Sequence, residues 1–432
     1  MNSTNNSKIN HLTMYLVSDV HLNNHSYDKN NWAENPERKI FREFLSNVIS
    51  KIQPDEKFLL ILNGDIFDIT GSWFTLPLPW DDDLESVEKL LHDVILEIIQ
   101  NNLDIFHELR QIFKNPNAEI IYVIGNHDGL LEVYPSAQKL IKNKLLEGFS
   151  LADQERFSFV TSFEYKELGL YVEHGHRLDP YNLYDSKQKP PLGDVVNVLI
   201  VNKLIETVSL RLKEHGYSEE VVNKIKDRLH DIEHIRPLVL IPLWIESIAN
   251  EHVNDLENAG KAVPIKTILR NIIAEILLDK SMTRFIVKRL HIPMVILNLS
   301  TSLLIMFPAI LPLISYVCTR VVRRTHSNKF QKKIALKLSK EYGYKFICFG
   351  HTHIPAFEAL NPDVYYFNSA SWTPVINLFK YRESEMPQEE LSNLDKHFKR
   401  IERCGYLKIT KDLTVPDSNA KFSLETIQIG EK

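Results

Sequence analysis

Residues 120–129 read IIYVIGNHDG, and this stretch decides which fold we expect. Its apolar run, rich in β-branched Ile and Val, predicts a strand buried on both faces. The run ends at Gly125, which permits a sharp turn, and Asn126, His127 and Asp128 follow at once. Ligands and catalytic groups of open α/β sheets gather at the carboxyl ends of strands. The stretch therefore predicts a strand that delivers polar side chains to a site.

The same pattern occurs twice earlier in the chain. Residues 12–18 form an apolar run that leads into Asp19 and His21, and residues 58–63 lead into Gly64 and Asp65. Segments with apolar residues at helical spacing separate these predicted strands. A β-α-β-α order followed by further strands predicts layered sheets with helices outside, which is an α/β fold.

Two later strand patterns also end in histidine. Alternating residues at 157–172 look like antiparallel strands that lead to His174, and residues 346–349 lead to His351 and His353. The intervening part of the chain has long helical patterns and few strand signals. We therefore divide the chain into a first core part, 1–178, a mainly helical insertion, 179–345, and a second core part, 346–432.

Near the end of this insertion, four apolar residues recur at four-residue steps: Phe330, Ile334, Leu338 and Tyr342. This spacing predicts an amphipathic helix that packs through that stripe before the next strand.

Composition limits the classes of protein to consider. A formal net charge of −5 argues against a dedicated binder of duplex DNA, so we do not expect a nucleic-acid partner. The amino-terminal residues are polar and show no secretory signal pattern, and three scattered cysteines fit a reducing compartment. We therefore expect a cytoplasmic location. The scattered cysteines also argue against a metal site built from thiolates.

The polar residues at the strand ends have the chemistry of metal ligands. Residues two apart in an extended chain point to the same side, so Asp19 can act with His21, and His351 with His353. Carboxylate, amide and imidazole ligands without thiolates suit manganese, iron or zinc.

Five motifs in order carry a resemblance to a known family: DxH at Asp19, GDxxD at Gly64, GNHD at Gly125, HG at His174 and GHxH at Gly350. With them the chain resembles the calcineurin-like metallophosphoesterases. The resemblance implies a four-layer α/β/β/α sandwich with a large insertion and a centre of two divalent metal ions, with manganese expected first and iron or zinc as alternatives.

The resemblance also implies a role for each residue. One ion would be held by Asp19, His21, Asp65 and His353, and the other by Asp65, Asn126, His174 and His351. A hydroxide bridging the ions would attack phosphorus. His127 would protonate the leaving oxygen or stabilise the phosphoryl oxygens, and Asp128 would orient its imidazole. Asp68 is expected to hydrogen-bond a ligand.

Within the family, GDIFD before a Trp-rich loop and GHTHIP leading to YYFNSASW are similar to the UDP-2,3-diacylglucosamine hydrolase branch. That branch usually has Arg at the position of His127, and its insertion is shorter. We therefore expect a phosphoester or pyrophosphate hydrolase acting on a phosphorylated small molecule or a lipid-linked substrate. The alternatives are a cyclic-nucleotide phosphodiesterase or nuclease, and a catalytically silent membrane-associated scaffold.

Residues 292–317 of the insertion contain no charged side chain, and basic residues flank them on both sides. Three interpretations stay open: a peripheral contact with an anionic membrane at its inner face, a buried lid or dimer core, and a membrane span. The run is long enough for one span of about 20 residues but not for two. A single span would leave His174 and His351 on opposite sides of the membrane, although one ion needs both.

Overall fold

The computed structural model of the chain describes residues 9–24, 36–73, 79, 83–179, 182, 194, 198, 202–230, 235–236, 248, 267–269, 271–272, 275, 328–369, 371–372, 375–377, 399–401, 403–415 and 418–428. The chain divides into two compact units. The first comprises Met1–Lys187, His326–Thr373 and Glu402–Lys432, and the second comprises Gln188–Thr325 and Pro374–Ile401. The first unit therefore contains all the residues predicted for the site.

The division differs from the predicted domain bounds at three places. Residues 179–187 belong to the first unit, although they fell within the predicted insertion. Helix α16 (Asn328–Tyr342) belongs to the first unit, although its residues fell within the predicted insertion. Pro374–Ile401 belongs to the second unit, although these residues fell within the second core part.

A six-stranded sheet carries the first three motifs, in the order β14-β13-β1-β2-β3-β4. Strands β1 (His11–Val17), β2 (Glu56–Asn63), β3 (Ala118–Val123) and β4 (Phe157–Val160) run parallel. Strands β13 (Arg403–Asp412) and β14 (Lys421–Gln428) extend the sheet antiparallel beyond β1. The carboxyl ends of β1, β2 and β3 consequently lie at one edge, as the motifs predict.

A five-stranded sheet has the order β5-β6-β8-β10-β9. Its strands are β5 (Phe163–Tyr165), β6 (Leu170–Val172), β8 (Phe346–Phe349), β10 (Val364–Asn368) and β9 (Ala356–Asn361). β8 runs parallel to both β6 and β10, so strands from before and after the insertion pair directly. The antiparallel prediction for 157–172 is correct for β5 and β6 but wrong for β4, which pairs parallel with β3 in the other sheet.

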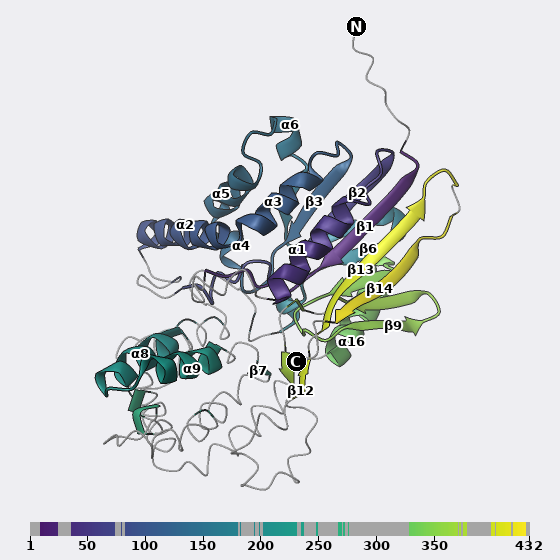
Figure 1. Ribbon diagram of the computed structural model, residues 1–432. Coiled ribbons are helices and arrows are strands. Elements are labelled where there is room, and N and C mark those ends of the chain that lie inside the picture. The colour runs from purple at the N-terminus through teal and green to yellow at the C-terminus, as the bar shows by residue number, and fades with distance from the viewer. Residues whose placement is uncertain are drawn as a thin grey trace. The chain divides into compact units, whose positions relative to one another are not determined.

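Helices α1 (Pro36–Ile49), α2 (Leu84–Asn101), α3 (Leu103–Ile112) and α5 (Pro135–Leu145) lie beside the six-stranded sheet (Figure 1). Two single-turn helices, α4 (Leu130–Val133) and α6 (Leu151–Gln154), precede and follow α5. The break between α2 and α3 falls at the buried Asn102, whose side-chain amide donates to the carbonyl of Ile98 at 2.7 Å. That amide satisfies a carbonyl at the end of α2 that the helix itself leaves unpaired.

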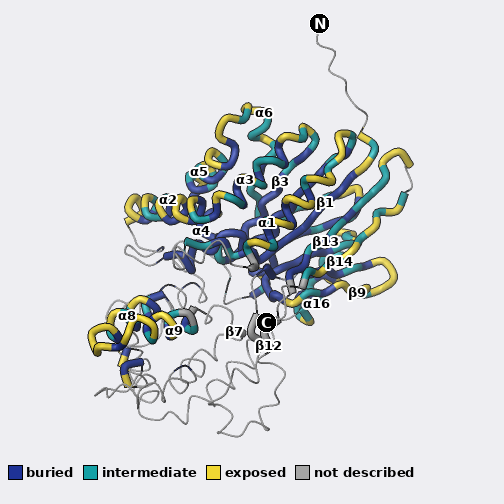
Figure 2. The backbone as a smooth tube through the Cα atoms, viewed as in Figure 1, coloured by how far each residue is buried: buried dark blue, intermediate teal, exposed yellow. Residues whose placement is uncertain are grey.

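The core lies between the two sheets. Buried apolar residues of β1, β2 and β3 pack in one cluster with residues of β6, β8 and β10, and Met14, Ile61 and Val172 are among its members. A second cluster packs α16 on the outer face of the five-stranded sheet through Ala335 and Ile347. Figure 2 shows the central strands buried and the outer helices with an exposed side. The predicted four-layer α/β/β/α arrangement is confirmed.

The buried face of α16 differs from the predicted stripe. Gln331 and Ala335 are fully buried, whereas Tyr342 is 66% exposed. Ile334 and Leu338 pack against the core only in part. The face is rotated because the side-chain amide of Gln331 reaches a buried backbone carbonyl, at Gly350.

The second unit contains α8 (Asn202–Glu214) and α9 (Glu219–His230), which pack together. It also contains a three-stranded sheet in the order β12-β11-β7, formed by β12 (Lys399–Ile401), β11 (Val375–Asn377) and β7 (Ile235–Arg236). Among the helices of the described residues, none is long and apolar enough to cross a membrane. Residues 292–317 lie outside the described residues, so the three interpretations of that run stay open.

Candidate metal centre

The residues predicted as ligands lie in the segments that follow the carboxyl ends of five strands. Asp19 and His21 follow β1, Asp65 follows β2, Asn126 follows β3, His174 follows β6, and His351 and His353 follow β8. All are buried except His21, which is partly buried. Six of the seven side chains form two groups, which we call the first and the second ligand cluster. Asn126 belongs to neither group, and its Oδ1 is buried.

The first ligand cluster consists of Asp19, His21 and His353, whose candidate ligand atoms lie within 4.8 Å of one another. Nε2 of His353 is 3.1 Å from Oδ1 of Asp19. The rings of His21 and His353 lie 5.3 Å apart between centroids. The predicted pairing of Asp19 with His21 is thus present in this cluster, whereas His353 is separated from His351, which lies in the second cluster.

The second ligand cluster consists of Asp65, His174 and His351, again with ligand atoms within 4.8 Å of one another. Nε2 of His174 is 3.0 Å from Oδ2 of Asp65. Nδ1 of His174 donates to the backbone carbonyl of Asn63 at 2.8 Å. This bond fixes the ring so that Nε2 is the nitrogen that faces the carboxylate.

The two clusters are adjacent. Nε2 of His174, in the second cluster, is 4.0 Å from Oδ1 of Asp19, in the first. Asp65 interacts electrostatically with His174 and also with His21 of the first cluster. The backbone N–H of His127 donates to Oδ1 of Asp65 at 2.9 Å. Asp65 therefore has the position expected of a carboxylate shared by both clusters.

The backbone at these ligands is strained. Among the described residues other than glycine, five have positive φ, and all five are predicted ligands: Asp19, His21, Asp65, His351 and His353, with φ between 52° and 69°. A left-handed conformation costs an L-residue about 1–2 kcal/mol. Strain of this kind persists where the surrounding structure imposes it, and it concentrates at functional sites. The backbone thus marks the same residues as the motifs do, by an independent criterion.

Two motif glycines allow the loops to approach the ligands. Gly64 has φ +80°, and a Cβ there would lie 2.4 Å from the His174 ring. A Cβ on Gly125 would lie 2.2 Å from Oδ1 of Asp65. Gly125 is not among the residues with positive φ, so the sharp turn expected from sequence does not explain the glycine. The close approach to Asp65 does explain it, because there is no space for a Cβ.

Neighbouring groups of opposite charge offset the effect of burial on the pKa values of the centre. Burial raises the pKa of the Asp19 carboxyl, but His353 and His174 outweigh it and hold that pKa well below its usual range. Burial likewise lowers the pKa of His174, but the carboxylates of Asp65 and Asp19 raise it to about 9. His176 has no such partner: burial, with His174 and His351 nearby, holds its pKa well below the usual value. The buried carboxylates are thus kept in the ionised form that binds cations.

His127 pairs with Asp68 rather than with Asp128. Nδ1 of His127 lies 2.7 Å from Oδ1 of Asp68, and Nδ1 of His21 lies 3.9 Å from the other oxygen of that carboxylate. The His127 side chain is 16% exposed, which leaves its ring accessible beside the ligands. Asp68 was expected to hydrogen-bond a ligand, but the ring that it hydrogen-bonds is that of His127, and its distance of 3.9 Å from the predicted ligand His21 is too long for a hydrogen bond. The three side chains form a third group whose candidate ligand atoms lie within 4.8 Å of one another.

The prediction that Asp128 orients the imidazole is corrected by the structure. The carboxylate of Asp128 is fully buried and accepts hydrogen bonds from the N–H of Ile66, the hydroxyl of Tyr122 and the N–H of Gly125. Burial, aided by the charge of Asp65, raises its pKa to about 6. Asp128 therefore joins the loops after β2 and β3, because backbone donors rather than the neighbouring ring surround it.

Sequence reasoning missed the residues that support the ligand loops from behind. The side-chain amides of Asn368 and Gln331 both donate to the carbonyl of Gly350, at 2.9 and 3.1 Å. The hydroxyl of Ser371 and the N–H of Trp372 both donate to the carbonyl of Asp19, at 3.1 and 3.0 Å. The segment YYFNSASW was noted only as a resemblance, and its polar residues after a strand were the available signal.

The residues present fit divalent metal ions. Four buried polar atoms of predicted ligands have no hydrogen-bond partner: Oδ1 of Asp19, Nε2 of His21, Oδ1 of Asn126 and Nε2 of His174. Leaving such atoms unpaired is costly unless a ligand satisfies them. Carboxylate, amide and imidazole donors together suit manganese, iron or zinc, and the geometry does not choose among these ions.

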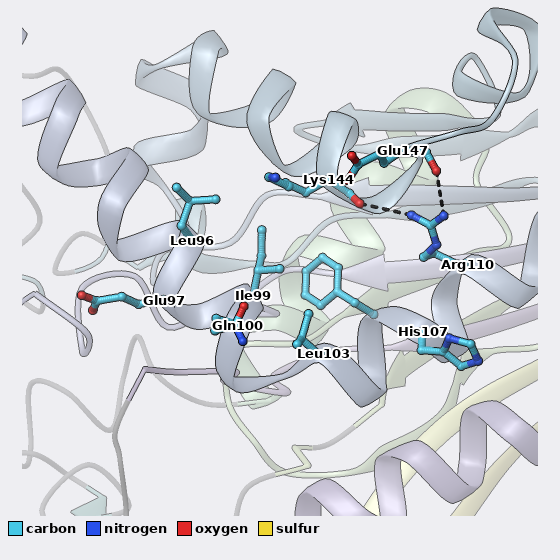
Figure 3. A pocket seen from close by; sticks show the side chains of 10 residues that line it. Leu96, Glu97, Ile99, Gln100, Leu103, His107, Arg110, Lys144 and Glu147 are labelled. Carbon is cyan, nitrogen blue, oxygen red and sulfur yellow. Dashed lines mark hydrogen bonds between the residues drawn. The ribbon is translucent and has the colours of Figure 1, made fainter.

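A pocket of about 710 Å³ lies elsewhere in the first unit, among α2, α3 and the end of α5 (Figure 3). None of the predicted site residues lines it. Arg110, one of the residues that line the pocket, donates to the carbonyls of Leu145 and Glu147, at 3.0 and 2.7 Å, and so caps the end of α5. This pocket is separate from the ligand clusters.

Comparisons with known proteins agree with the site. The family model of the calcineurin-like phosphoesterases matches residues 12–239, which is more than half of the chain. A search of curated proteins finds no match. The matched range contains the ligands from Asp19 to His174, and the structure adds His351 and His353 through the pairing of β8 with β6. The chain therefore belongs to the calcineurin-like phosphoesterase family, and it is a metal-dependent phosphoester hydrolase.

Proposed function

We propose that the chain hydrolyses a phosphate ester or anhydride with two divalent ions, one held by each ligand cluster, and that Asp65 is shared between them. The observation that carries the proposal is the contact of Nε2 of His174 with carboxylates of both clusters, at 3.0 Å from Asp65 and 4.0 Å from Asp19. When bound, two such ions neutralise phosphate charge and lower the pKa of water. Asn126 would complete the ligand set with its buried Oδ1.

His127 would assist departure of the leaving group. Asp68 accepts the Nδ1–H of His127, so Nε2 is the ring nitrogen that would exchange a proton with the substrate. The negative charge of Asp68 favours the protonated ring, which would donate to the leaving oxygen or stabilise the phosphoryl oxygens. Asp128 contributes by holding the loop that carries His127.

We further propose an amphiphilic, lipid-linked pyrophosphate as the substrate, with a peripheral contact to an anionic membrane. The support comes from sequence: the similarity to the diacylglucosamine hydrolase branch, and the uncharged residues 292–317 between basic flanks. Basic residues beside an apolar segment favour an anionic lipid surface. Sedimentation with vesicles tests this proposal. The full chain should bind phosphatidylglycerol vesicles more strongly than phosphatidylcholine vesicles, and a chain lacking residues 292–317 should lose the difference.

A metal-dependence assay tests the two-ion proposal. Protein stripped with chelator should be inactive on an aryl phosphate ester and should recover activity when Mn²⁺ returns, with two ions bound per chain. His174→Ala should not recover, because it removes the nitrogen that contacts both carboxylates. His107→Ala is a matched control, since that histidine lines the separate pocket and pairs with Gln111. Full activity of His174→Ala would refute the assignment.

A further inference from the structure

Asp179 is a buried carboxylate that the five motifs do not include. It directly follows the 3₁₀ helix η3 (His176–Leu178), and its N–H donates to the carbonyl of His176 at 2.9 Å. Gly175, with φ +101°, turns the chain from His174 into this helix. One short segment therefore carries both a candidate ligand, His174, and the Asp179 carboxylate.

The carboxylate of Asp179 reaches across to the loop that follows β8. Its Oδ2 lies 3.3 Å from Nε2 of His351, and both side chains are at most 5% exposed. The side-chain amide of Asn182 donates to the same Oδ2 at 3.0 Å, and its nitrogen also lies 3.5 Å from Nε2 of His351. The carboxylate thus has two nitrogen partners, one on each side of the long insertion in sequence.

Asp179 stands outside the ligand atoms themselves. The atoms of the second cluster that lie within 4.8 Å of one another belong to Asp65, His174 and His351, and that group does not include Asp179. A ring nitrogen that donates to a carboxylate carries the proton, and the other nitrogen is then the metal ligand. Of the two contacts of Nε2 of His351, Oδ2 of Asp179 is the nearer, at 3.3 Å against 3.5 Å for the Asn182 amide, and an Nε2–H donated to that carboxylate would leave Nδ1 for the ion.

We propose that Asp179 is a positioning residue, which holds the Nε2–H of His351 and makes Nδ1 the ligand nitrogen of that ring. The inference rests on the two-ion function proposed above. His174 shows the opposite arrangement, because its Nδ1 donates to the Asn63 carbonyl and Nε2 faces Asp65. The second cluster therefore uses two histidines of opposite tautomer, each set by an oxygen acceptor behind the ring.

A titration of the full-length, chelator-stripped chain with Zn²⁺ tests the proposal. Outer partners of metal-ligating histidines commonly contribute 10–100-fold to metal affinity. We expect Asp179→Ala to weaken one of the two ions by about that factor and to leave the other unchanged. Asp179→Asn, which keeps an oxygen acceptor, should fall between Asp179→Ala and the wild type.

Glu173→Gln is the matched control. Glu173 is buried on the same segment and next to His174, but its carboxylate accepts from the hydroxyl of Tyr171 at 2.7 Å and not from a ligand. We expect this variant to bind both ions like the wild type. Melting of every variant in chelator separates lost affinity from lost folding.

The tautomer gives a second measurement that needs no variant. In the Zn²⁺-loaded, ¹⁵N-histidine-labelled chain, we expect His351 to carry its proton on Nε2. A proton on Nδ1, or wild-type affinity for both ions in folded Asp179→Ala, would overturn the role of Asp179 while leaving the two-ion function intact. A wild-type chain that binds no Zn²⁺ would instead refute the proposed function, and this inference with it.

Discussion

The two ligand clusters hold their side chains in different ways. All three residues of the first cluster have left-handed backbone, and His21 has an Nε2 without a hydrogen-bond partner. In the second cluster, His174 lies outside the left-handed region, and an acceptor stands behind each ring: the Asn63 carbonyl for His174 and Asp179 for His351. Left-handed backbone also occurs at Asp65 and His351 of the second cluster, so the two clusters differ at His174, whose ring is held by a backbone carbonyl and not by a left-handed φ.

The difference shows that a ligand can be aimed by its backbone or by a partner behind it. The first way costs conformational energy at the ligand itself, and the second way depends on additional residues. The carboxylate of Asp68 lies between His21, which belongs to the first cluster, and His127. The first cluster is thus the one beside the proposed proton donor.

We propose that Asp65 is shared between the two ions, so its loss should have the largest effect. We expect Asp65→Ala to lower kcat/KM for an aryl phosphate ester by about 1,000-fold or more, because ions at such centres contribute several kcal/mol and both are affected. His21→Ala and His351→Ala, each confined to one cluster, should lower it less. A loss in Asp65→Ala no greater than in His21→Ala would contradict the shared position.

In the metal-free protein, protonation of His174 in the second cluster should make the stability of the chain depend on pH. Its folded pKa of about 9 lies above the unfolded value of about 6.5. The stabilisation is therefore fully present below pH 6.5 and is lost as the pH rises through about 9, by up to about 3 kcal/mol. Urea denaturation in chelator between pH 6 and pH 10 measures this loss.

His174→Gln is the control for that titration, because it removes the ionising group. The variant should show a flatter pH dependence in chelator. Mn²⁺ should also flatten the dependence of the wild type, since a ligating imidazole is neutral. A wild-type chain whose stability in chelator is unchanged from pH 7 to pH 10 would contradict the raised pKa.

The pair of His127 and Asp68, beside the first cluster, should affect turnover more than metal binding. We expect His127→Gln to lower kcat by about 100-fold with both ions retained, because general acid catalysis contributes at least about that factor. Asp68→Asn should lower kcat less, and the double variant should lose little more than His127→Gln alone, because the two side chains act as one unit. Steady-state kinetics with metal analysis measures both quantities. Strictly additive losses would contradict the pair.

Sequence predicted that these residues follow strand ends and lie near one another, because strand patterns are strong, and their role as metal ligands stays a prediction. It also predicted layered sheets from those patterns, but it misplaced β4 and did not predict β9 of the five-stranded sheet. The four-layer order followed from the motifs through the family resemblance. These features depend on local periodicity and on residue type.

Other features of the site depend on contacts between distant segments, which local patterns do not contain. Asp68 rather than Asp128 faces His127, because the loop after β2 passes beside the ring while Asp128 turns back toward Tyr122. Gln331 lies off the predicted apolar stripe of α16, yet it is buried and donates to the carbonyl of Gly350. The left-handed φ of His21 has no sign in sequence, since histidine rarely adopts it.

The smallest effect that we predict measures this backbone difference directly. His21→Gly and His21→Ala both remove the imidazole and differ only in Cβ. At φ 53° glycine is relaxed, whereas alanine keeps the strain, so His21→Gly should be more stable by about 1 kcal/mol. At His174, which lies outside the left-handed region, the order should reverse, with His174→Ala the more stable by roughly 0.5–1 kcal/mol.

Denaturation of all four variants in chelator measures these differences, because both members of a pair lack the same ligand and metal binding does not contribute. If alanine were the more stable residue at both positions, strain could not be what aims the first cluster, and His21 would need a partner as His174 does. If glycine were the more stable residue only at position 21, the free energy of the backbone would distinguish His21 from His174. The conformational cost would then fall on His21, whose ring lies 3.9 Å from the Asp68 carboxylate. That carboxylate pairs with His127, the proposed proton donor.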